Sequence, residues 1–123
     1  MFEPKLGFVL LFVRNPHKSA QFYSSLFNLK PIEQSPTFAM FALPNGVMLG
    51  LWSAYTAEPR VESSPGASEI CFGTEKVDDL FEAWGKHGVT MIQKPTEMDF
   101  GRTFVAIDPD GHRIRVYKLR EEK

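Results

Sequence analysis

Hydrophobic and polar positions follow the same order twice along this chain. The first pass begins at residues 7–14, where β-branched and aromatic side chains dominate and predict a strand. Asn15-Pro16 then suits the start of a helix, because asparagine caps helices and proline fits the first helical position. The next segment has apolar residues at helical spacing, which predicts an amphipathic helix packed on a sheet; they are Ala20, Phe22, Tyr23, Leu26 and Phe27.

Three strand candidates follow this helix, at residues 30–34, 37–43 and 47–52. The last two are joined through Asn45-Gly46, a dipeptide typical of tight hairpin turns. Residues 54–66 come next; they are rich in Pro, Ser and Gly toward their end, lack apolar periodicity and are interpreted as a linker. The first half of the chain therefore predicts a strand, a helix and three further strands.

The second half repeats this order after the linker. Residues 68–73 predict a strand, and a helical stripe follows that stops before Gly88. Three more strands are expected at 89–93, 102–108 and 112–119, the last two joined by an Asp-Pro-Asp-Gly turn. The helical stripe consists of Val77, Leu80, Phe81 and Trp84.

A repeat of roughly sixty residues predicts a duplicated supersecondary unit within a single α+β domain, residues 1–123. The expected βαβββ units span about 6–53 and about 67–119, separated by the linker at 54–66. Each unit is expected to form half an open barrel, with the helix on its convex face and a ligand cavity on its concave face. We expect a homodimer, because a partner subunit would cover the open strand edges.

The composition restricts the possible partners and compartments. With 14 basic and 15 acidic residues the net charge is -1 and no basic block occurs, so nucleic acid is not expected as a partner. The longest apolar stretch, residues 8–13, is too short to span a bilayer, and no signal-peptide pattern is seen, so no membrane association is expected. The single cysteine, Cys71, cannot form an internal disulfide, which fits a reducing compartment; a cytoplasmic location is expected.

Three groups of residues resemble a known superfamily. They are residues 12–15, Ser19 with Phe22-Tyr23, and residues 104–116, which read FVAIDPDGHRIRV and are similar to the closing hairpin of the vicinal oxygen chelate superfamily. This superfamily includes glyoxalases, extradiol dioxygenases and bleomycin-resistance proteins, and the resemblance covers nearly the whole chain. Within it, residues 51–53, 68–70 and 100–116 look most like the phenazine antibiotic resistance proteins. The resemblance implies a small dimer that binds an aromatic antibiotic without consuming it.

By this resemblance the superfamily's metal-ligand positions fall on Phe8, Gly50, Glu69 and Arg115. One carboxylate, a phenyl ring, a residue without a side chain and a permanent cation cannot coordinate a divalent ion, so we expect no metal. No other cofactor and no catalytic residue is expected. The three histidines, at positions 17, 87 and 112, fall at helix ends or beside a turn and are expected at the surface.

Strand alternation supplies the apolar candidates for ligand binding. Trp52 shares the strand phase of Gly50, so its indole is expected either to stack on a planar ligand or to lie in the core or a dimer interface. Gly50 either leaves room for a flat ring or marks a bulge or a close backbone approach. Phe8, Phe38 and Met40 are expected to line the cavity, with ordinary core packing as the alternative.

The polar candidates come mainly from the second half. Glu69 and Arg115 are expected to form a buried ion pair where an enzyme of the superfamily would hold its metal, or else to bind a ligand carboxylate. Arg102 either clamps an acidic group of the ligand or lies in solvent. Cys71 shares the phase of Glu69 and is expected to line the cavity as a small buried residue without a nucleophilic role.

These observations favour one functional hypothesis over two others. The favoured one is metal-free binding and sequestration of a small planar aromatic compound, as in phenazine-type antibiotic resistance, rather than catalysis. The alternative is a glyoxalase-like or other metal-dependent lyase or dioxygenase that uses an unforeseen metal site. The third is a scaffold that retains the fold and binds no ligand.

Overall fold

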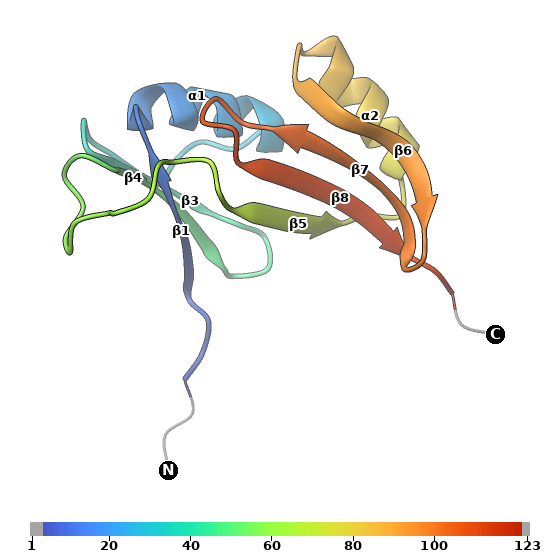
Figure 1. Ribbon diagram of the computed structural model, residues 1–123, viewed down its shortest axis with the longest axis horizontal. Helices are drawn as coiled ribbons and strands as arrows, with labels where there is room; N and C mark the ends of the chain where they lie inside the picture. The colour runs from blue at the N-terminus through green and yellow to red at the C-terminus, as the bar shows by residue number, and fades with distance from the viewer. Residues whose placement is uncertain (1–3, 122–123) are drawn as a thin grey trace. The chain divides into compact units, whose positions relative to one another are not determined.

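The computed structural model describes residues 4–121, which divide into two compact units. Unit 1 ends at Pro65 and unit 2 begins at Gly66. Within the described residues, each unit has one helix and four strands (Figure 1). Unit 1 contains β1 (Phe8–Val13), α1 (Pro16–Phe27), β2 (Glu33–Gln34), β3 (Phe38–Ala42) and β4 (Met48–Ser53). Unit 2 contains β5 (Glu69–Gly73), α2 (Val77–Lys86), β6 (Thr90–Met98), β7 (Gly101–Ile107) and β8 (Arg113–Leu119).

The two sheets have the same topology. The strand order is β1-β4-β3-β2 in unit 1 and β5-β8-β7-β6 in unit 2. In each sheet the first strand of the unit lies parallel to the fourth, and the other neighbours are antiparallel. The predicted α+β class and the duplicated βαβββ order are therefore confirmed.

Helix α1 begins and ends where its local sequence directs. The Lys18 N–H donates to the side-chain oxygen of Asn15 at 3.2 Å, and Pro16 occupies the first turn, as predicted. At the other end Asn28 adopts the left-handed conformation with φ of 53°, which asparagine tolerates better than most residues. Within residues 4–121, no helix has both the length and the apolar character needed to cross a membrane.

The core of unit 1 lies between α1 and one face of its sheet. Tyr23 of α1 is fully buried and stacks on Phe27 at 5.5 Å between ring centroids, and Phe27 meets Phe41 edge-on at 6.2 Å. The sheet contributes alternate residues to this core, each at most 1% exposed: Leu11, Val13, Ala39, Phe41, Leu49 and Leu51. Strand alternation directs the intervening side chains to the opposite face.

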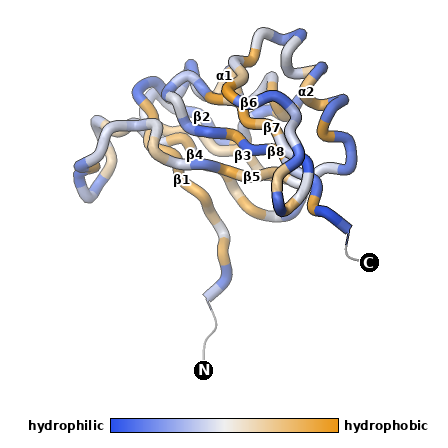
Figure 2. The backbone as a smooth tube through the Cα atoms, turned by 45° about the vertical axis from the view of Figure 1, so that its right-hand side comes forward, coloured by the Kyte–Doolittle hydropathy of each residue, from blue (hydrophilic) through white to orange (hydrophobic). Residues whose placement is uncertain are grey.

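The core of unit 2 is centred on Phe104 of β7. The rings of Phe81 and Trp84, both from α2, approach Phe104 at 5.4 and 5.5 Å in edge-to-face geometry. Ile114 and Val116 of β8 are fully buried in the same sheet. Hydrophobic and hydrophilic residues alternate along α2 in Figure 2, as expected of a helix with one face on a sheet.

Two strand boundaries differ from the prediction. The strand expected at residues 30–34 is limited to Glu33–Gln34, and Pro31 before it has no N–H to donate to a ladder. The strand expected at 89–93 continues to Met98, with register shifts on both sides of Gln93. The extension passes through Pro95, which is tolerated because β6 lies at the edge of its sheet.

Candidate functional site

Unit 1 presents an apolar sheet face on the side opposite α1, which we call the aromatic face. Phe8 and Leu10 on it are 47% and 38% exposed, although large apolar side chains are normally buried. The other side chains on it are half-buried, and Gly50 is buried. The aromatic face consists of Phe8, Leu10 and Phe12 from β1, Phe38 and Met40 from β3, and Met48, Gly50 and Trp52 from β4.

Trp52 lies between two phenyl rings on the aromatic face. In the sheet register it is paired with Phe12 of β1 and with Phe38 of β3. The Phe12 ring is 6.2 Å away and tilted by 32°, and the Phe38 ring is 6.5 Å away and perpendicular. The indole is thus positioned by its neighbours and stays half-buried, an arrangement suited to stacking on a planar molecule.

The space above Gly50 is occupied by neighbouring side chains. A Cβ atom at this position would lie 2.5 Å from Cδ2 of Leu10 and 3.2 Å from Cε1 of Phe38. The missing side chain therefore allows β1 and β3 residues to pack closely over β4. A flat ring could enter here only if the flexible end of Leu10 moved aside.

The predicted ion pair between Glu69 and Arg115 is present, but it belongs to a larger group. Nε of Arg115 lies 3.2 Å from one carboxylate oxygen of Glu69, and Nε of Arg113 lies 2.8 Å from the other. Nη1 of Arg115 also donates to Oε1 of Gln93 at 3.3 Å and to Oγ1 of Thr103 at 3.2 Å. We call these five residues the arginine cluster.

The expectation that this ion pair is buried is wrong. The Glu69 side chain is 32% exposed and that of Arg115 is 15% exposed, so solvent reaches both charges. Glu69 also has Arg113 as a second partner, which the sequence analysis missed. The sequence did contain a signal for this partner, because Arg113 and Arg115 are two residues apart and therefore point to the same face of a strand. In the structure Arg113 is the direct register partner of Glu69.

Cys71 differs from the prediction of a small buried residue, because it is exposed. Its Sγ lies 4.0 Å from a carboxylate oxygen of Glu69, which places it beside the arginine cluster. Partial burial raises the pKa of the Cys71 thiol most, the charge of Glu69 raises this pKa further, and Arg115 opposes both. The raised pKa favours the neutral thiol, which is a weaker nucleophile than the thiolate.

Arg102 lies apart from the arginine cluster. Strand alternation places it on the other side of β7 from Thr103, where its Nε and Nη2 donate to the two carboxylate oxygens of Asp78 in α2 at 2.6 and 2.9 Å. Glu97 lies 3.5 Å away on the neighbouring strand. The hydrogen bond from Arg102 lowers the pKa of Asp78, so Arg102 is engaged by protein carboxylates instead of lying open to a ligand.

His112 is buried, contrary to the prediction that all three histidines lie at the surface. Nδ1 lies 2.8 Å from Oδ2 of buried Asp108, and Nε2 accepts from the N–H of Gly66 at 3.2 Å. The acceptor role of Nε2 assigns the ring proton to Nδ1, which donates to Asp108. Because Gly66 is 46 residues away in sequence, no local pattern could reveal this contact.

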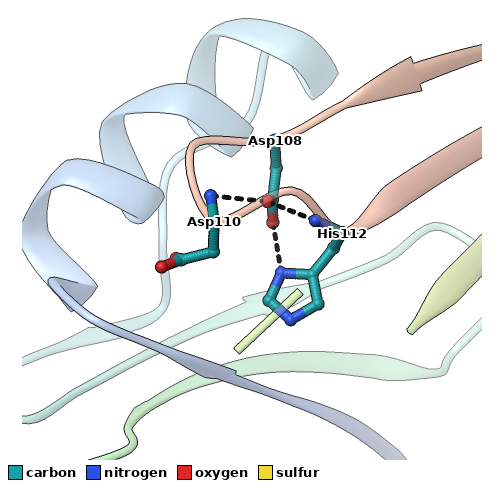
Figure 3. A group of neighbouring side chains, drawn as sticks. All are labelled: Asp108, Asp110 and His112. Carbon is teal, nitrogen blue, oxygen red and sulfur yellow. Dashed lines mark hydrogen bonds and ion pairs between the residues drawn. The ribbon is translucent and has the colours of Figure 1, made fainter. Parts of the chain in front are cut away.

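Asp108, Asp110 and His112 form the one group of three or more His, Cys, Asp or Glu residues within residues 4–121 whose ligand atoms are close enough for a metal, within 4.8 Å of one another (Figure 3). The ligand atoms of Asp108 and His112 are already engaged. Oδ1 of Asp108 accepts from the backbone N–H groups of Asp110 and His112, each at 2.9 Å, and Oδ2 faces the imidazole. These bonds brace the turn between β7 and β8 and leave neither imidazole nitrogen free for an ion.

The four positions that the resemblance assigns to metal ligands do not fit a divalent cation either. Phe8 and Gly50 of unit 1 have no donor atom in their side chains. In unit 2, both oxygens of Glu69 face guanidinium groups, and Arg115 is itself a cation. A metal ion would have to displace two arginines to gain a single carboxylate ligand, so this donor set does not support the metal chemistry of the superfamily's enzymes.

Comparison with known proteins agrees with this fold. The phenazine antibiotic resistance protein EhpR of Enterobacter agglomerans is 36% identical over 116 residues, which cover 89% of this chain and 88% of that protein. The solution structure of protein ATC0852 from Agrobacterium tumefaciens is 46% identical, with a TM-score of 0.85 and coverage of 98% of this chain and 100% of that one. A glyoxalase/bleomycin resistance protein/dioxygenase from Nocardioides, 20% identical, shares the fold with a TM-score of 0.85 over 100% of this chain and 88% of its own.

The family match covers both units. It extends over residues 5–116 and therefore includes the aromatic face, the arginine cluster and the Asp108–His112 turn. Together with the duplicated βαβββ topology, this match shows that the chain belongs to the Glyoxalase/Bleomycin resistance protein/Dioxygenase superfamily.

Proposed function

We propose that this protein binds a small planar aromatic compound without a metal and sequesters it, as in resistance to a phenazine-type antibiotic. The observation that carries the proposal is the aromatic face of unit 1, where Trp52 is positioned between Phe12 and Phe38 among exposed apolar side chains. A contiguous exposed apolar surface is typical of interaction sites and ligand-binding grooves. The 36% identity to a phenazine antibiotic resistance protein supports the same class of ligand.

The predicted ligand-binding residues lie in both units, and the proposal uses those of unit 1. Phe8, Phe38, Met40 and Trp52 supply apolar contact to the ring system, and Gly50 could take part only if the Leu10 side chain moved aside. Glu69, Cys71 and Arg115 belong to unit 2, and the predicted polar contacts from them are not part of the site proposed on unit 1. Arg102 is left out, because Asp78 and Glu97 already hold its guanidinium.

Sequestration is favoured over catalysis by the chemistry of the side chains. A metal-dependent lyase or dioxygenase needs several donor atoms around one ion, and the superfamily positions provide a single carboxylate that two arginines already engage. The raised pKa of the Cys71 thiol keeps it in its weakly nucleophilic form. The protein would then act in stoichiometric amounts, by lowering the free concentration of its ligand.

The Trp52→Ala variant tests the binding site. Because aromatic stacking contributes roughly 0.5–1.5 kcal/mol beyond area burial, the affinity for phenazine measured by calorimetry should fall several-fold. The melting temperature should change little, since Trp52 is outside the core. Tyr55→Ala is the matched control: Tyr55 is 77% exposed in the loop after β4, outside the aromatic face, and its removal should leave the affinity unchanged. Equal affinities in wild type and Trp52→Ala would contradict the proposed site.

A further inference from the structure

We infer that Leu10 sets the length of the ring system that the aromatic face accepts, because its side chain fills the space above Gly50 and has to move aside before a third fused ring can lie there. This inference rests on the proposed function, since it adds the size of the ligand and the residue that selects it. It is carried by the side-chain packing over Gly50 within unit 1.

Gly50 is buried, although it lies on the sheet face that is turned away from α1. In the sheet register it is flanked by Leu10 of β1 and by Met40 of β3. Two side chains cover it: Cδ2 of Leu10 lies 2.5 Å, and Cε1 of Phe38 lies 3.2 Å, from the place of an added Cβ atom. The end of the Leu10 side chain therefore takes the space that a side chain at position 50 would occupy.

The two covering side chains differ in how easily they can move. The Phe38 ring stands perpendicular to the Trp52 indole, 6.5 Å away between centroids, and this packing between large rings holds it in place. Leu10 is 38% exposed, contacts Gly50 only with the far end of its side chain, and lies on the edge strand β1. A change of Leu10 to another staggered rotamer can thus uncover Gly50 without a change in the backbone.

A planar molecule stacked on Trp52 can extend along β4 in one direction only. Strand β4 ends at Ser53, directly after Trp52, so the sheet continues beneath a longer ligand only toward Gly50. Gly50 lies two residues before Trp52, which corresponds to roughly 7 Å along a strand. A two-ring molecule can therefore stack on the indole alone, whereas a three-ring molecule extends into the space that Leu10 fills.

The inference is tested with two probes that differ by one fused ring, quinoxaline and phenazine. In Leu10→Ala the affinity for phenazine relative to quinoxaline should rise about tenfold, because the third ring no longer displaces a side chain and even one methylene in an apolar pocket changes recognition about tenfold or more. Adding Gly50→Ala to this variant should return the relative affinity toward the wild-type value, because the new methyl group takes part of the vacated space. Ile32→Ala is the matched control: Ile32 is 57% exposed before β2, outside the aromatic face, and its truncation should keep the wild-type ratio.

A measurement on the wild type alone covers the case in which the variants fold poorly. With carbon-13-labelled leucine methyl groups, saturating phenazine should change the difference between the two Cδ shifts of Leu10, which depends on the rotamer, and saturating quinoxaline should leave it nearly unchanged. A wild-type affinity ratio in Leu10→Ala, or Leu10 shifts that phenazine leaves unchanged, would overturn the inference and leave the proposed aromatic site standing. Binding of neither probe by the wild type would overturn the proposed function as well.

Discussion

At the scale of single residues, Cys71 reports on the charges of the arginine cluster. Partial burial and Glu69 raise the pKa of the thiol, and Arg115 lowers it. A raised pKa means that the reactive thiolate forms at higher pH than in an ordinary cysteine, so alkylation by iodoacetamide at about pH 8 should be several-fold slower in the folded protein than in the same protein unfolded in urea.

Two variants give this prediction a sign test. Glu69→Gln removes a charge that raises the pKa of Cys71, so alkylation should become faster. Arg115→Gln removes the charge that lowers this pKa, so alkylation should become slower. Rates that change in the same direction in both variants would contradict the electrostatic account of this group.

The residue scale also marks the limit of inference from sequence. Alternation along β4 placed Trp52 and Gly50 on one sheet face, and alternation along β8 would have added Arg113 to Arg115. Exposure and tertiary contacts could not be obtained in this way. His112 looks like an ordinary turn residue until Gly66, at the end of the linker, is seen to donate to its ring.

At the scale of elements, Gly101 holds together the two strands that carry most of the arginine cluster. It begins β7 with φ of 143°, and a Cβ atom there would overlap the Lys118 carbonyl oxygen of β8 and lie 2.8 Å from the backbone nitrogen of Arg120. Gly101→Ala should therefore destabilise the protein by about 2 to 4 kcal/mol in urea unfolding, through both backbone strain and separation of the strands.

Gly85→Ala is the matched control for this prediction. Gly85 lies in α2, is exposed and has no atom of a neighbouring residue within 4 Å of the place an added methyl group would take, so alanine should stabilise the helix by about 0.5 to 1 kcal/mol. Similar unfolding midpoints for Gly101→Ala and wild type would show that the β7–β8 pairing does not depend on the close approach at Gly101.

The helices and strands were predictable because the spacing of apolar residues and the capping residues agree with the packing seen in the structure. The helix at Pro16–Phe27 follows from Asn15, Pro16 and the apolar spacing, all of which act locally. The extension of β6 through Pro95 was not predictable, since it depends on β6 being an edge strand. Strand order is a property of the whole sheet, and a local pattern does not contain it.

At the scale of the whole molecule, we propose a homodimer of single-domain subunits. Strand β1 is at the edge of its sheet and is apolar throughout (Figure 2), and unpaired apolar edges are normally covered. Sedimentation at micromolar concentration should give about twice the chain mass of 14.0 kDa. A single species of monomer mass under these conditions would contradict the dimer.

The central claim is that an aromatic ligand binds without a metal and is not consumed. The most direct measurement is calorimetric titration of phenazine into protein treated with a chelator and checked for residual metal, followed by recovery of the compound. We predict saturable binding that is unaltered by added zinc or nickel ions, with the compound recovered unchanged, since Phe8, Gly50, Glu69 and Arg115 cannot form a coordination shell. Binding that appears only when metal is restored, or conversion of the compound, would contradict the account.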